Sequence, residues 1–425
     1  EWRTQPLWGV GAGGPFLHDG RADTIDDAIR MHGGESAASR DAYIALSESA
    51  RGQVLAFLNS LGGASQFTEG LLPLDAPVPA PGSEGGPQVS LDAAQMQRFV
   101  DGRAVFDRDV PINDGLGPAF NGDACRSCHF DPTIGGAGPV DLDVSRHGTV
   151  TGGVFAEPSG GTMAHRHGLP GTGRPYFDDL SNVIEARQTP SILGLGLLEA
   201  IPEANILALA DPDDLDADGI SGVAHMRPDG RLGRFGWKGG VPSLAEFARD
   251  AMFNELGVTL PDQDGLTLGG DSDSDDVPDP EISVEELEQL TFFMANLAQP
   301  VGVSTDGAAE AAGETHFEAA GCLDCHAVLD DADGMPVFAY TDLLLHDVQE
   351  DGFTGIADGV ATQAEFRTPP LWGIRGTAPY MHDGRAFTLE QAIASHAGEA
   401  EMSRLAYEAL SGAEREQLLQ SPPSL

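Results

Sequence analysis

Apolar residues recur at helical spacing in several short segments of this chain. Over residues 283–297, Leu287, Leu290 and Phe293 fall on one side of a helix. The same spacing predicts helices over residues 90–106, 308–320 and 388–397, with Ser90 and Thr388 as N-caps. Runs that alternate between apolar and polar residues, as half-buried strands do, are scarce. With 55 Gly and 29 Pro, the chain is therefore predicted to be mainly α and loop-rich.

An internal repeat joins the two ends of the chain. Residues 3–56 align without a gap with residues 367–420, and about half of the aligned positions are identical. The alignment pairs His18 with His382 and His32 with His396. Only the second copy follows a Cys-x-x-Cys-His motif, so residues 1–63 are predicted to be a partial repeat of the tail of the C-terminal domain. After the second copy, Pro422 and Pro423 interrupt the last helix.

A Pro- and Gly-rich stretch divides the repeat from the rest of the chain. Residues 64–90 show no helical or strand period and are predicted to be a linker. Residues 91–300 and 301–425 each contain one Cys-x-x-Cys-His motif, and we expect two domains there.

The formal net charge is −44, with a pI of about 4.2. Nucleic acid and anionic membrane surfaces are therefore unlikely partners on charge alone, because both need a basic surface. The charge would steer a basic partner protein at low salt, or would serve solubility in a saline habitat. No run of 18 apolar residues predicts a membrane span. Because the chain starts at Glu1 without a signal peptide, we expect a processed product or a fragment.

All four cysteines lie in two motifs, Cys125-Arg-Ser-Cys128-His129 and Cys322-Leu-Asp-Cys325-His326. Two cysteines at this spacing reach the two vinyl groups of one haem, and the adjacent histidine faces the iron. Zinc needs four ligands, of which each motif supplies at most three. A redox dithiol does not need the histidine. The sequence therefore predicts two covalently bound c-type haems and, since this attachment takes place outside the cytoplasm, a periplasmic or otherwise exported protein.

Several segments around these motifs resemble a known family. They are F-N-G-D-A-C-R-S-C-H-F (120–130), G-L-G-L-L-E-A-I-P-E (194–203), D-P-D-D-L-D-A-D-G-I-S-G (211–222), D-L-L-L-H-D (342–347), R-T-P-P-L-W-G (367–373) and P-Y-M-H-D-G-R-A (379–386). They resemble the di-haem oxidoreductases, a group of peroxidases and thiol oxidoreductases within the bacterial di-haem cytochrome c peroxidase and MauG superfamily. The resemblance covers roughly residues 91–420. It implies two cytochrome c-like domains, a first, peroxidatic haem and a second, electron-transfer haem.

The resemblance also suggests the distal side of the second haem. The residue that ends the helix after the H-x-G motif is usually a Met ligand in these peroxidases, and here it is His396. Two histidine ligands generally give a lower potential than His and Met. By the same resemblance, His382 lies at the haem edge and binds a propionate. His346 and Met381 are alternative ligands.

The first haem has several candidate ligands. In the peroxidases a loop histidine after the first motif caps the resting iron, and His147 fits that spacing. The other candidates are His165, His167 and His225. An open, five-coordinate iron, as a working peroxidase needs, is the remaining possibility.

A peroxidase also needs an acid/base to move a proton between the peroxide oxygens. By resemblance Glu246 is the first candidate, because it follows a Trp-x-Gly turn at Trp237. Glu199 is the second, since burial in its apolar run would raise its pKa. Trp237 could carry electrons between the haems or pack in the core.

Asp214, Asp216 and Asp218 alternate before Gly219, like the front half of a calcium loop. An EF-hand is excluded because its twelfth position is His225, so a shorter calcium loop is the prediction. Asp271, Asp273 and Asp275 repeat the spacing. In the peroxidases, calcium lies between the haems and couples activation to electron transfer.

The sequence thus predicts an exported di-haem oxidoreductase that reduces hydrogen peroxide at the first haem. The second haem would receive electrons from a small donor protein, and the net charge favours a basic one. A MauG-like oxidation of a protein side chain, a non-enzymatic electron-transfer protein and a redox-sensing protein are the alternatives.

Overall fold

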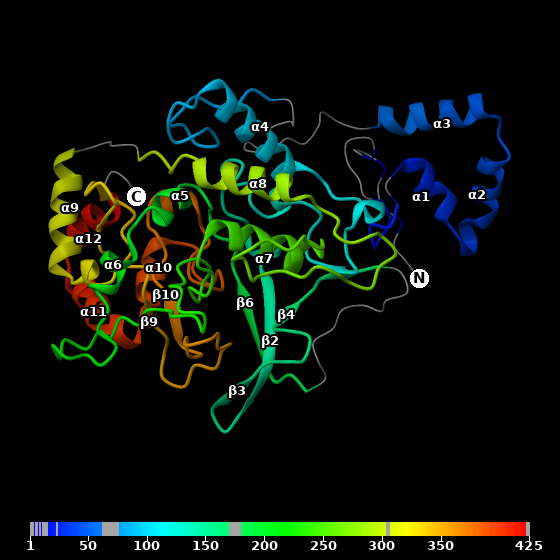
Figure 1. Ribbon diagram of the computed structural model, residues 1–425. Coiled ribbons are helices and arrows are strands. Elements are labelled where there is room, and N and C mark those ends of the chain that lie inside the picture. The colour runs from blue at the N-terminus through cyan, green and yellow to red at the C-terminus, as the bar shows by residue number, and fades with distance from the viewer. Residues whose placement is uncertain are drawn as a thin grey trace. The chain divides into compact units, whose positions relative to one another are not determined.

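The computed structural model describes residues 4, 7, 10, 16–22, 24–61, 76–169, 180–302 and 307–421 (Figure 1). The chain divides into two compact units, Glu1–Thr68 and Glu69–Leu425. Both Cys-x-x-Cys-His motifs lie in the second unit. The two predicted haem regions, 91–300 and 301–425, therefore belong to one compact unit.

The described residues form twelve α-helices and ten short strands. The helices of the second unit are α4 (Ala93–Asp107), α5 (Leu195–Glu199), α6 (Glu203–Leu207), α7 (Leu244–Leu256), α8 (Val284–Asn296), α9 (Gly307–Ala319), α10 (Leu389–Ala394), α11 (Glu401–Ala409) and α12 (Gly412–Gln420). Its longest strands are β2 (Val144–Thr151) and β6 (Val183–Arg187), and the others are β1 (Ala119–Phe120), β3 (Val154–Ala156), β4 (Met163–Ala164), β5 (His167–Gly168), β7 (Leu329–Asp330), β8 (Pro336–Val337), β9 (Leu345–Asp347) and β10 (Glu365–Arg367). The predicted mainly α class is confirmed.

The first unit contains α1 (Ile25–Met31), α2 (Ala37–Ile44) and α3 (Glu48–Ser60). Its local structure repeats that of α10. Thr24 before α1 and Thr388 before α10 each accept a hydrogen bond from the backbone N–H three residues later. After each helix comes a histidine, His32 or His396, whose Nδ1 donates to the carbonyl oxygen four residues earlier, at 2.7 and 2.8 Å. The sequence repeat is thus also a repeat of local geometry.

Helices α4 and α8 pack closely and carry the larger core. A Cβ atom at Gly102 of α4 would lie 2.0 Å from the carbonyl oxygen of Gln289 in α8, so only glycine permits this approach. The rings of Phe99 and Phe106 lie 4.9 and 5.4 Å from that of Phe293. This core lies beside the first motif, because the Phe106 ring is 6.4 Å from the His129 ring.

Capping residues fix where these two helices begin. Ser283 forms a capping box with Glu286 at the start of α8, as the predicted helix over 283–297 requires. The cap of α4 is Asp92, with Gln95 as its partner, so the expectation of Ser90 was wrong by two residues. The side chain of Asp92 has the same cap chemistry and sits where the first helical turn can reach it.

A four-stranded antiparallel sheet interrupts the first haem region. Strand β2 pairs with β3, β4 and β6, and it projects below the helices in Figure 1. The sequence did not predict this sheet. In addition, residues 76–90 of the predicted linker pack against the body, since Gln88 donates to the Asn296 carbonyl at 2.7 Å and Ala298 donates to that of Gly86 at 2.9 Å.

A second, smaller core surrounds the second motif. Its buried members are Phe317, Tyr340, Leu371, Tyr407 and Leu418. Helix α12 ends at Gln420, before Pro422, as predicted. Within the described ranges, every helix is too short or too polar to span a membrane.

Candidate functional site

The second motif follows α9 and begins with a short 3₁₀ helix, Cys322–Asp324. Gly321 makes the turn between them with a φ of 78°, which favours glycine. His326 then donates a hydrogen bond from Nδ1 to the Tyr340 carbonyl at 2.9 Å. Burial lowers the pKa of His326 to about 4, so its ring is neutral at pH 7. The Nε2 lone pair is therefore left for a metal.

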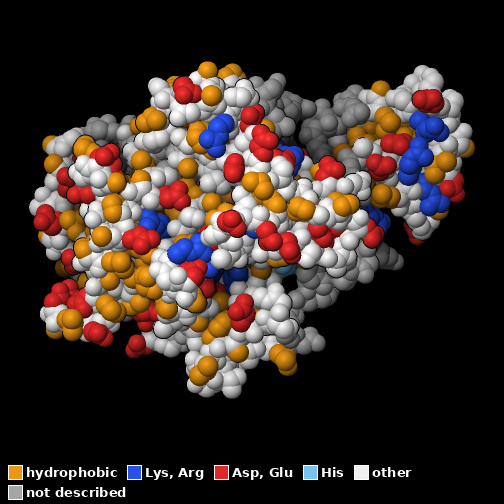
Figure 2. Space-filling model, viewed as in Figure 1, with side chains coloured by type: hydrophobic (Ala, Val, Ile, Leu, Met, Phe, Trp, Pro, Cys, Tyr) orange, Lys and Arg blue, Asp and Glu red, His pale blue; other side chains and the backbone are white. Residues whose placement is uncertain are grey.

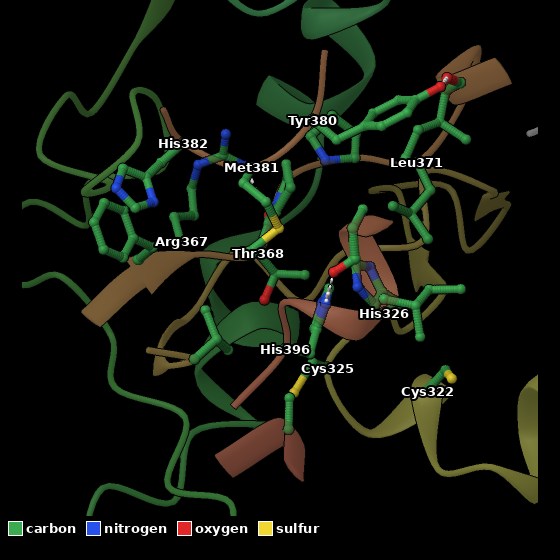
Figure 3. Close-up of a pocket in the computed structure, with 18 of the residues that line it drawn as sticks. Cys322, Cys325, His326, Arg367, Thr368, Leu371, Tyr380, Met381, His382 and His396 are labelled. Carbon is green, nitrogen blue, oxygen red and sulfur yellow. Dashed lines mark hydrogen bonds between the residues drawn. The ribbon is translucent and has the colours of Figure 1, made fainter. Parts of the chain in front are cut away.

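A cavity opens beside this histidine (Figure 3). It contains about 2210 Å³ of space without protein atoms, part of it open to solvent. Cys322, Cys325, His326 and His396 all line it. Leu371 and Trp372 contribute to its largely apolar wall.

His396 lies beside His326 in this cavity (Figure 3). Its Nδ1 donates to the Ala392 carbonyl at 2.8 Å, so its Nε2 also carries the free lone pair. Burial lowers the pKa of His396, and His396 in turn helps to lower that of His326. Two neutral imidazoles with free Nε2 atoms thus line one cavity, and their role as a pair of axial ligands stays a prediction.

The polar part of the cavity wall includes Arg367 and His382, which are almost fully buried. Gln349 also lines the cavity, and its side-chain oxygen accepts from Arg385 at 3.2 Å. Gln349 is 5% exposed, and its Nε2 has no hydrogen-bond partner among the described residues. A haem is an apolar macrocycle with two carboxylates, so an apolar cavity with the buried guanidinium of Arg367 and an unpaired donor fits it.

His382 is stacked on Phe366, with ring centroids 3.9 Å apart. Burial, with the charge of Arg187 nearby, lowers the pKa of His382 to about 2, so this ring is neutral. Its position on the cavity wall is compatible with the predicted role at the haem edge. Met381 also lines the cavity.

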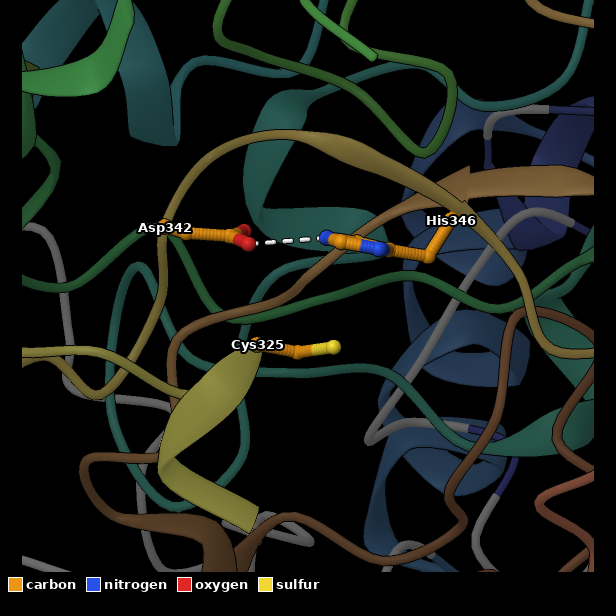
Figure 4. Close-up of side chains that lie close together, drawn as sticks. All are labelled: Cys325, Asp342 and His346. Carbon is orange, nitrogen blue, oxygen red and sulfur yellow. Dashed lines mark hydrogen bonds and ion pairs between the residues drawn. The ribbon is translucent and has the colours of Figure 1, made fainter. Parts of the chain in front are cut away.

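His346 cannot serve as the alternative ligand (Figure 4). Its Nε2 contacts Asp342 at 2.8 Å, and its Nδ1 contacts Glu399 at 2.9 Å. Burial alone would lower the pKa of His346, but these carboxylates raise it far above its usual value. A protonated ring with both nitrogens occupied has no lone pair for iron. Glu399 also accepts from the backbone N–H and the hydroxyl of Ser221, which ties the 211–222 loop to this cluster.

The first motif has the same local design. The 3₁₀ helix Cys125–Ser127 leads to His129, whose Nδ1 contacts the Gly136 carbonyl at 3.3 Å. Burial lowers the pKa of His129 to about 4. Burial also raises the pKa of the Cys125 and Cys322 thiols to about 12. This ring is again neutral, with its Nε2 lone pair left for a metal.

The sequence analysis missed two carboxyl groups on α7, Asp250 and Glu255, of which Glu255 acts on Cys128. Burial raises the pKa of both Asp250 and Glu255 on α7, against the opposing charge of Arg146. Glu255 also accepts from Asn121 at 2.7 Å and acts electrostatically on Cys128. Both carboxyl side chains stay partly accessible to solvent. The pattern of α7 gave no signal for this role, because the partners come from distant segments.

The four candidate histidines of the first region are each engaged. His147 on β2 is buried, and its Nδ1 contacts the Ser181 hydroxyl at 2.8 Å. His165 donates from Nε2 to the Asn254 carbonyl at 2.9 Å, and His225 donates from Nδ1 to that of Lys238 at 2.7 Å. The His167 ring lies 5.4 Å from that of Phe120. The ring nitrogens of His165 and His225 that face carbonyls are unavailable to iron.

Glu246, the first acid/base candidate, is fully buried at the start of α7. It accepts from the backbone N–H groups of Thr267 and Leu268 at 2.8–3.0 Å and pairs with Arg231 at 2.8 Å. Burial alone would raise the pKa of Glu246, but these donors hold it below its usual value. This geometry favours a structural role. Glu199 accepts from the backbone N–H of Leu244 at 2.7 Å.

Trp237 lines the cavity of the second motif, and its Nε1 donates to the Gln188 carbonyl at 2.8 Å. Pro190, two residues after Gln188, lines the same cavity, and its backbone acts on the pKa of His129 in the first motif. Residues 188–190 therefore link the surroundings of Trp237 to the first motif.

The two acidic loops are arranged differently from the prediction. Asp211, Asp214 and Asp216 bring their oxygens within 4.8 Å of one another, whereas Asp218 accepts from the backbone N–H of Ile220 at 2.8 Å. In the later loop Asp273, Asp275 and Glu281 form the group, and Asp271 is not part of it.

The family follows from a comparison with known sequences. The family model described as "Di-haem oxidoreductase, putative peroxidase" matches residues 1–61 and 172–425. The chain belongs to this family. The match includes the second motif, its cavity and both copies of the repeat, while the first motif lies between the matched ranges. A di-haem oxidoreductase has haem cofactors and a redox function.

No curated protein matches this di-haem oxidoreductase. Two of the solved structures that resemble it are distant in sequence. Hydrazine synthase of Kuenenia stuttgartiensis is 15% identical, with a TM-score of 0.40 over 85% of this chain and 100% of that one. A MauG-like protein associated with microbial copper homeostasis is 19% identical, with a TM-score of 0.37 over 81% and 92%. At these TM-scores the likenesses carry no further conclusion.

Proposed function

We propose that this di-haem oxidoreductase is an exported peroxidase that reduces hydrogen peroxide at the first motif with electrons that enter at the second. The supporting observation is that the two motifs differ. The second motif places His396 beside His326 in one cavity, which suits a six-coordinate iron that only transfers electrons. The first motif has the carboxyl group of Glu255 nearby, whose raised pKa suits proton transfer.

Covalent attachment is part of the proposal. Each cysteine pair precedes a histidine whose Nδ1 is bound to a carbonyl, so the two thiols and the free Nε2 can face one cofactor. In the loaded protein these thiols would be thioethers. Arg367, His382 and Gln349 would then meet the propionates of the second haem.

Peroxide reduction consumes two electrons and two protons and forms two water molecules. A haem iron at His129 would supply peroxide binding and the electrons. Glu255 is suited to hold a proton, because its raised pKa favours the neutral acid, and Arg146 stabilises the anion that remains. Trp237 lines the cavity of the second motif, donates to Gln188 and is the proposed electron bridge.

Calcium at the loop of Asp214, Asp216 and Asp218 remains a prediction. The carboxylates of Asp211, Asp214 and Asp216 offer hard oxygen ligands of the kind that calcium prefers. The loop is tied to Glu399 through Ser221, so removal of calcium by a chelator should alter electron transfer between the haems.

The test is peroxide turnover by the haem-loaded protein with a small-molecule reductant. We expect one high-spin and one low-spin signal by electron paramagnetic resonance, and a fall of about 100-fold in turnover for Glu255→Gln with unchanged spectra. Glu199→Gln is the matched control. Two low-spin irons that ignore peroxide and carbon monoxide would instead indicate an electron carrier. Peroxide-dependent oxidation of a protein side chain would indicate the MauG-like alternative.

A further inference from the structure

A β-hairpin directly after the second motif exposes apolar side chains. Strands β7 and β8 pair Leu329 with Val337, so Val328 and Phe338 are neighbours at the open end of the hairpin. Val328 is 37% exposed, Phe338 is 50% exposed and Met335 is 62% exposed. We call residues 328–338 the hairpin surface.

The hairpin surface is close to the proximal histidine of the second motif. The ring centroid of Phe338 lies 6.4 Å from that of Tyr340, and the Tyr340 carbonyl accepts the Nδ1 hydrogen bond of His326 at 2.9 Å. Phe317 also contacts both rings, 6.1 Å from Tyr340 and 6.2 Å from His326. An exposed aromatic residue is thus separated from the motif by one layer of packed side chains.

Helix α6 extends this apolar surface. The side chain of Asn205 donates to the Asp330 carbonyl at 2.9 Å and holds α6 against the hairpin. Leu207 and Leu209 at the end of α6 are 41% and 45% exposed. Two segments that this hydrogen bond joins therefore both expose apolar residues, as the segments of protein contact sites do.

The charges around these residues are of one sign. Residues 250–366, which include the hairpin surface and the second motif, contain no Lys or Arg. Asp324, Asp330 and Asp333 are exposed here. Asp218 of the neighbouring loop lies close enough to add to the effect of burial in raising the pKa of Asp324. In Figure 2, red and orange side chains interleave at the lower left, over α6 and the loop that follows it.

We propose that the hairpin surface and the end of α6 form the docking site for a small basic electron-donor protein. Its positive face would meet Asp324, Asp330 and Asp333, and its exposed prosthetic-group edge would meet Phe338. A small apolar centre with an acidic rim suits a brief encounter, because steering by charge raises the rate of association more than the affinity. A haem held by His326 would be the acceptor of the one electron that the reduced donor gives up.

This inference rests on the proposed function only in taking the second motif as the entry point for electrons. The test is stopped-flow reduction of the oxidised, haem-loaded protein by a basic single-haem cytochrome c, without peroxide. We expect the second-order rate constant to fall roughly 100-fold when ionic strength rises from about 10 mM to about 300 mM. The same cytochrome with acetylated lysines should react slowly even at low salt.

Variants locate the site. Phe338→Ser should lower the rate constant roughly tenfold. The double variant Asp330→Asn/Asp333→Asn should lower the rate constant several-fold and weaken its dependence on salt. Matched controls are Val154→Ser, at an apolar residue on β3 that is 71% exposed, and Asp264→Asn. Both should react as the unchanged protein does. Equal rates for the hairpin variants and the controls, or for the acetylated and native donor, would overturn the proposal.

A small-molecule reductant separates this proposal from the peroxidase proposal. It does not need a docking site, so the hairpin variants should consume peroxide with it at the unchanged rate. The basic cytochrome could reduce the hairpin variants more slowly than the unchanged protein while neither protein consumes peroxide. That result would support the docking site and refute the peroxidase. A loss of reduction by both donors would show damage to the second haem and overturn the docking site.

Discussion

Replacing Glu246 by Gln distinguishes a structural carboxylate from a catalytic one. The Glu246 carboxylate is fully buried, and it meets the backbone N–H groups of Thr267 and Leu268 and the guanidinium of Arg231. Gln has the same shape, but its amide NH2 must face one of these donors. The buried N–H group on that side loses its acceptor, and the ion pair with Arg231 is lost.

The expected cost follows from these contacts. An unsatisfied buried N–H costs about 2 kcal/mol, and a partly exposed ion pair contributes roughly 1 kcal/mol, so the free energy of unfolding should fall by about 3 kcal/mol. With about 2.1 cal/mol/K of unfolding entropy per residue, the unit Glu69–Leu425 should lose roughly 4 °C in Tm. Turnover per folded molecule should hardly change.

The pH dependence gives a second readout. Because the donors hold the pKa of Glu246 below its usual value, its contribution to stability is present above that usual value. The contribution is lost as the pH falls through the folded-state pKa. The Tm difference between the original protein and Glu246→Gln should therefore be full at pH 7 and shrink in acid.

The assay pairs differential scanning calorimetry with peroxide turnover, both on the haem-loaded protein. Glu255→Gln is the counterpart, because it should lower turnover with little change in Tm. If Glu246→Gln abolished turnover at an unchanged Tm, the structural interpretation of Glu246 would be wrong and the prediction from the sequence would stand.

Three further predictions concern the ligands, the bridge and the core. His396→Ala should convert one low-spin iron signal to high-spin, whereas His346→Gln should not, and electron paramagnetic resonance decides between them. Trp237→Phe removes the Nε1 hydrogen bond to Gln188, so inter-haem transfer followed by flash photolysis should slow roughly tenfold, and an unchanged rate would exclude it as the bridge. Gly102→Ala forces α4 away from α8, so denaturant titrations should show a free energy of unfolding lower by about 2–3 kcal/mol. An unchanged free energy of unfolding would mean that the two helices can move apart without cost.

The sequence predicted well those features that depend only on residues close together in the chain. The spacing of each Cys-x-x-Cys-His motif, the Thr388 cap and the break at Pro422 depend on neighbours within one or two turns. His396 was proposed from the family resemblance, and it could be placed because it closely follows a short helix whose cap lies in the same segment. The helix over 283–297 was likewise predicted from its own period and cap.

Long-range partners decided the rest. His346 looked like a ligand beside apolar residues, but Asp342 and Glu399 occupy both ring nitrogens. Glu246 and Glu255 share one helix, and their different surroundings come from Thr267 and Leu268 in one case and Asn121 in the other. The sheet of β2 and β6 was missed because its strands gain their pairing from each other and show little alternation of their own.

The burial of the motif thiols bears on the order of events in the making of this protein. A thioether forms from a thiolate, and the folded surroundings hold the pKa of Cys125 and Cys322 near 12, so few thiolates exist there at neutral pH. Under the proposed covalent attachment, these raised pKa values favour attachment of the haems while the chain is still open. The cofactors would then act as folding nuclei around which Phe106, Phe317 and their neighbours collapse. Biosynthesis, rather than the finished fold, would set the yield of active protein.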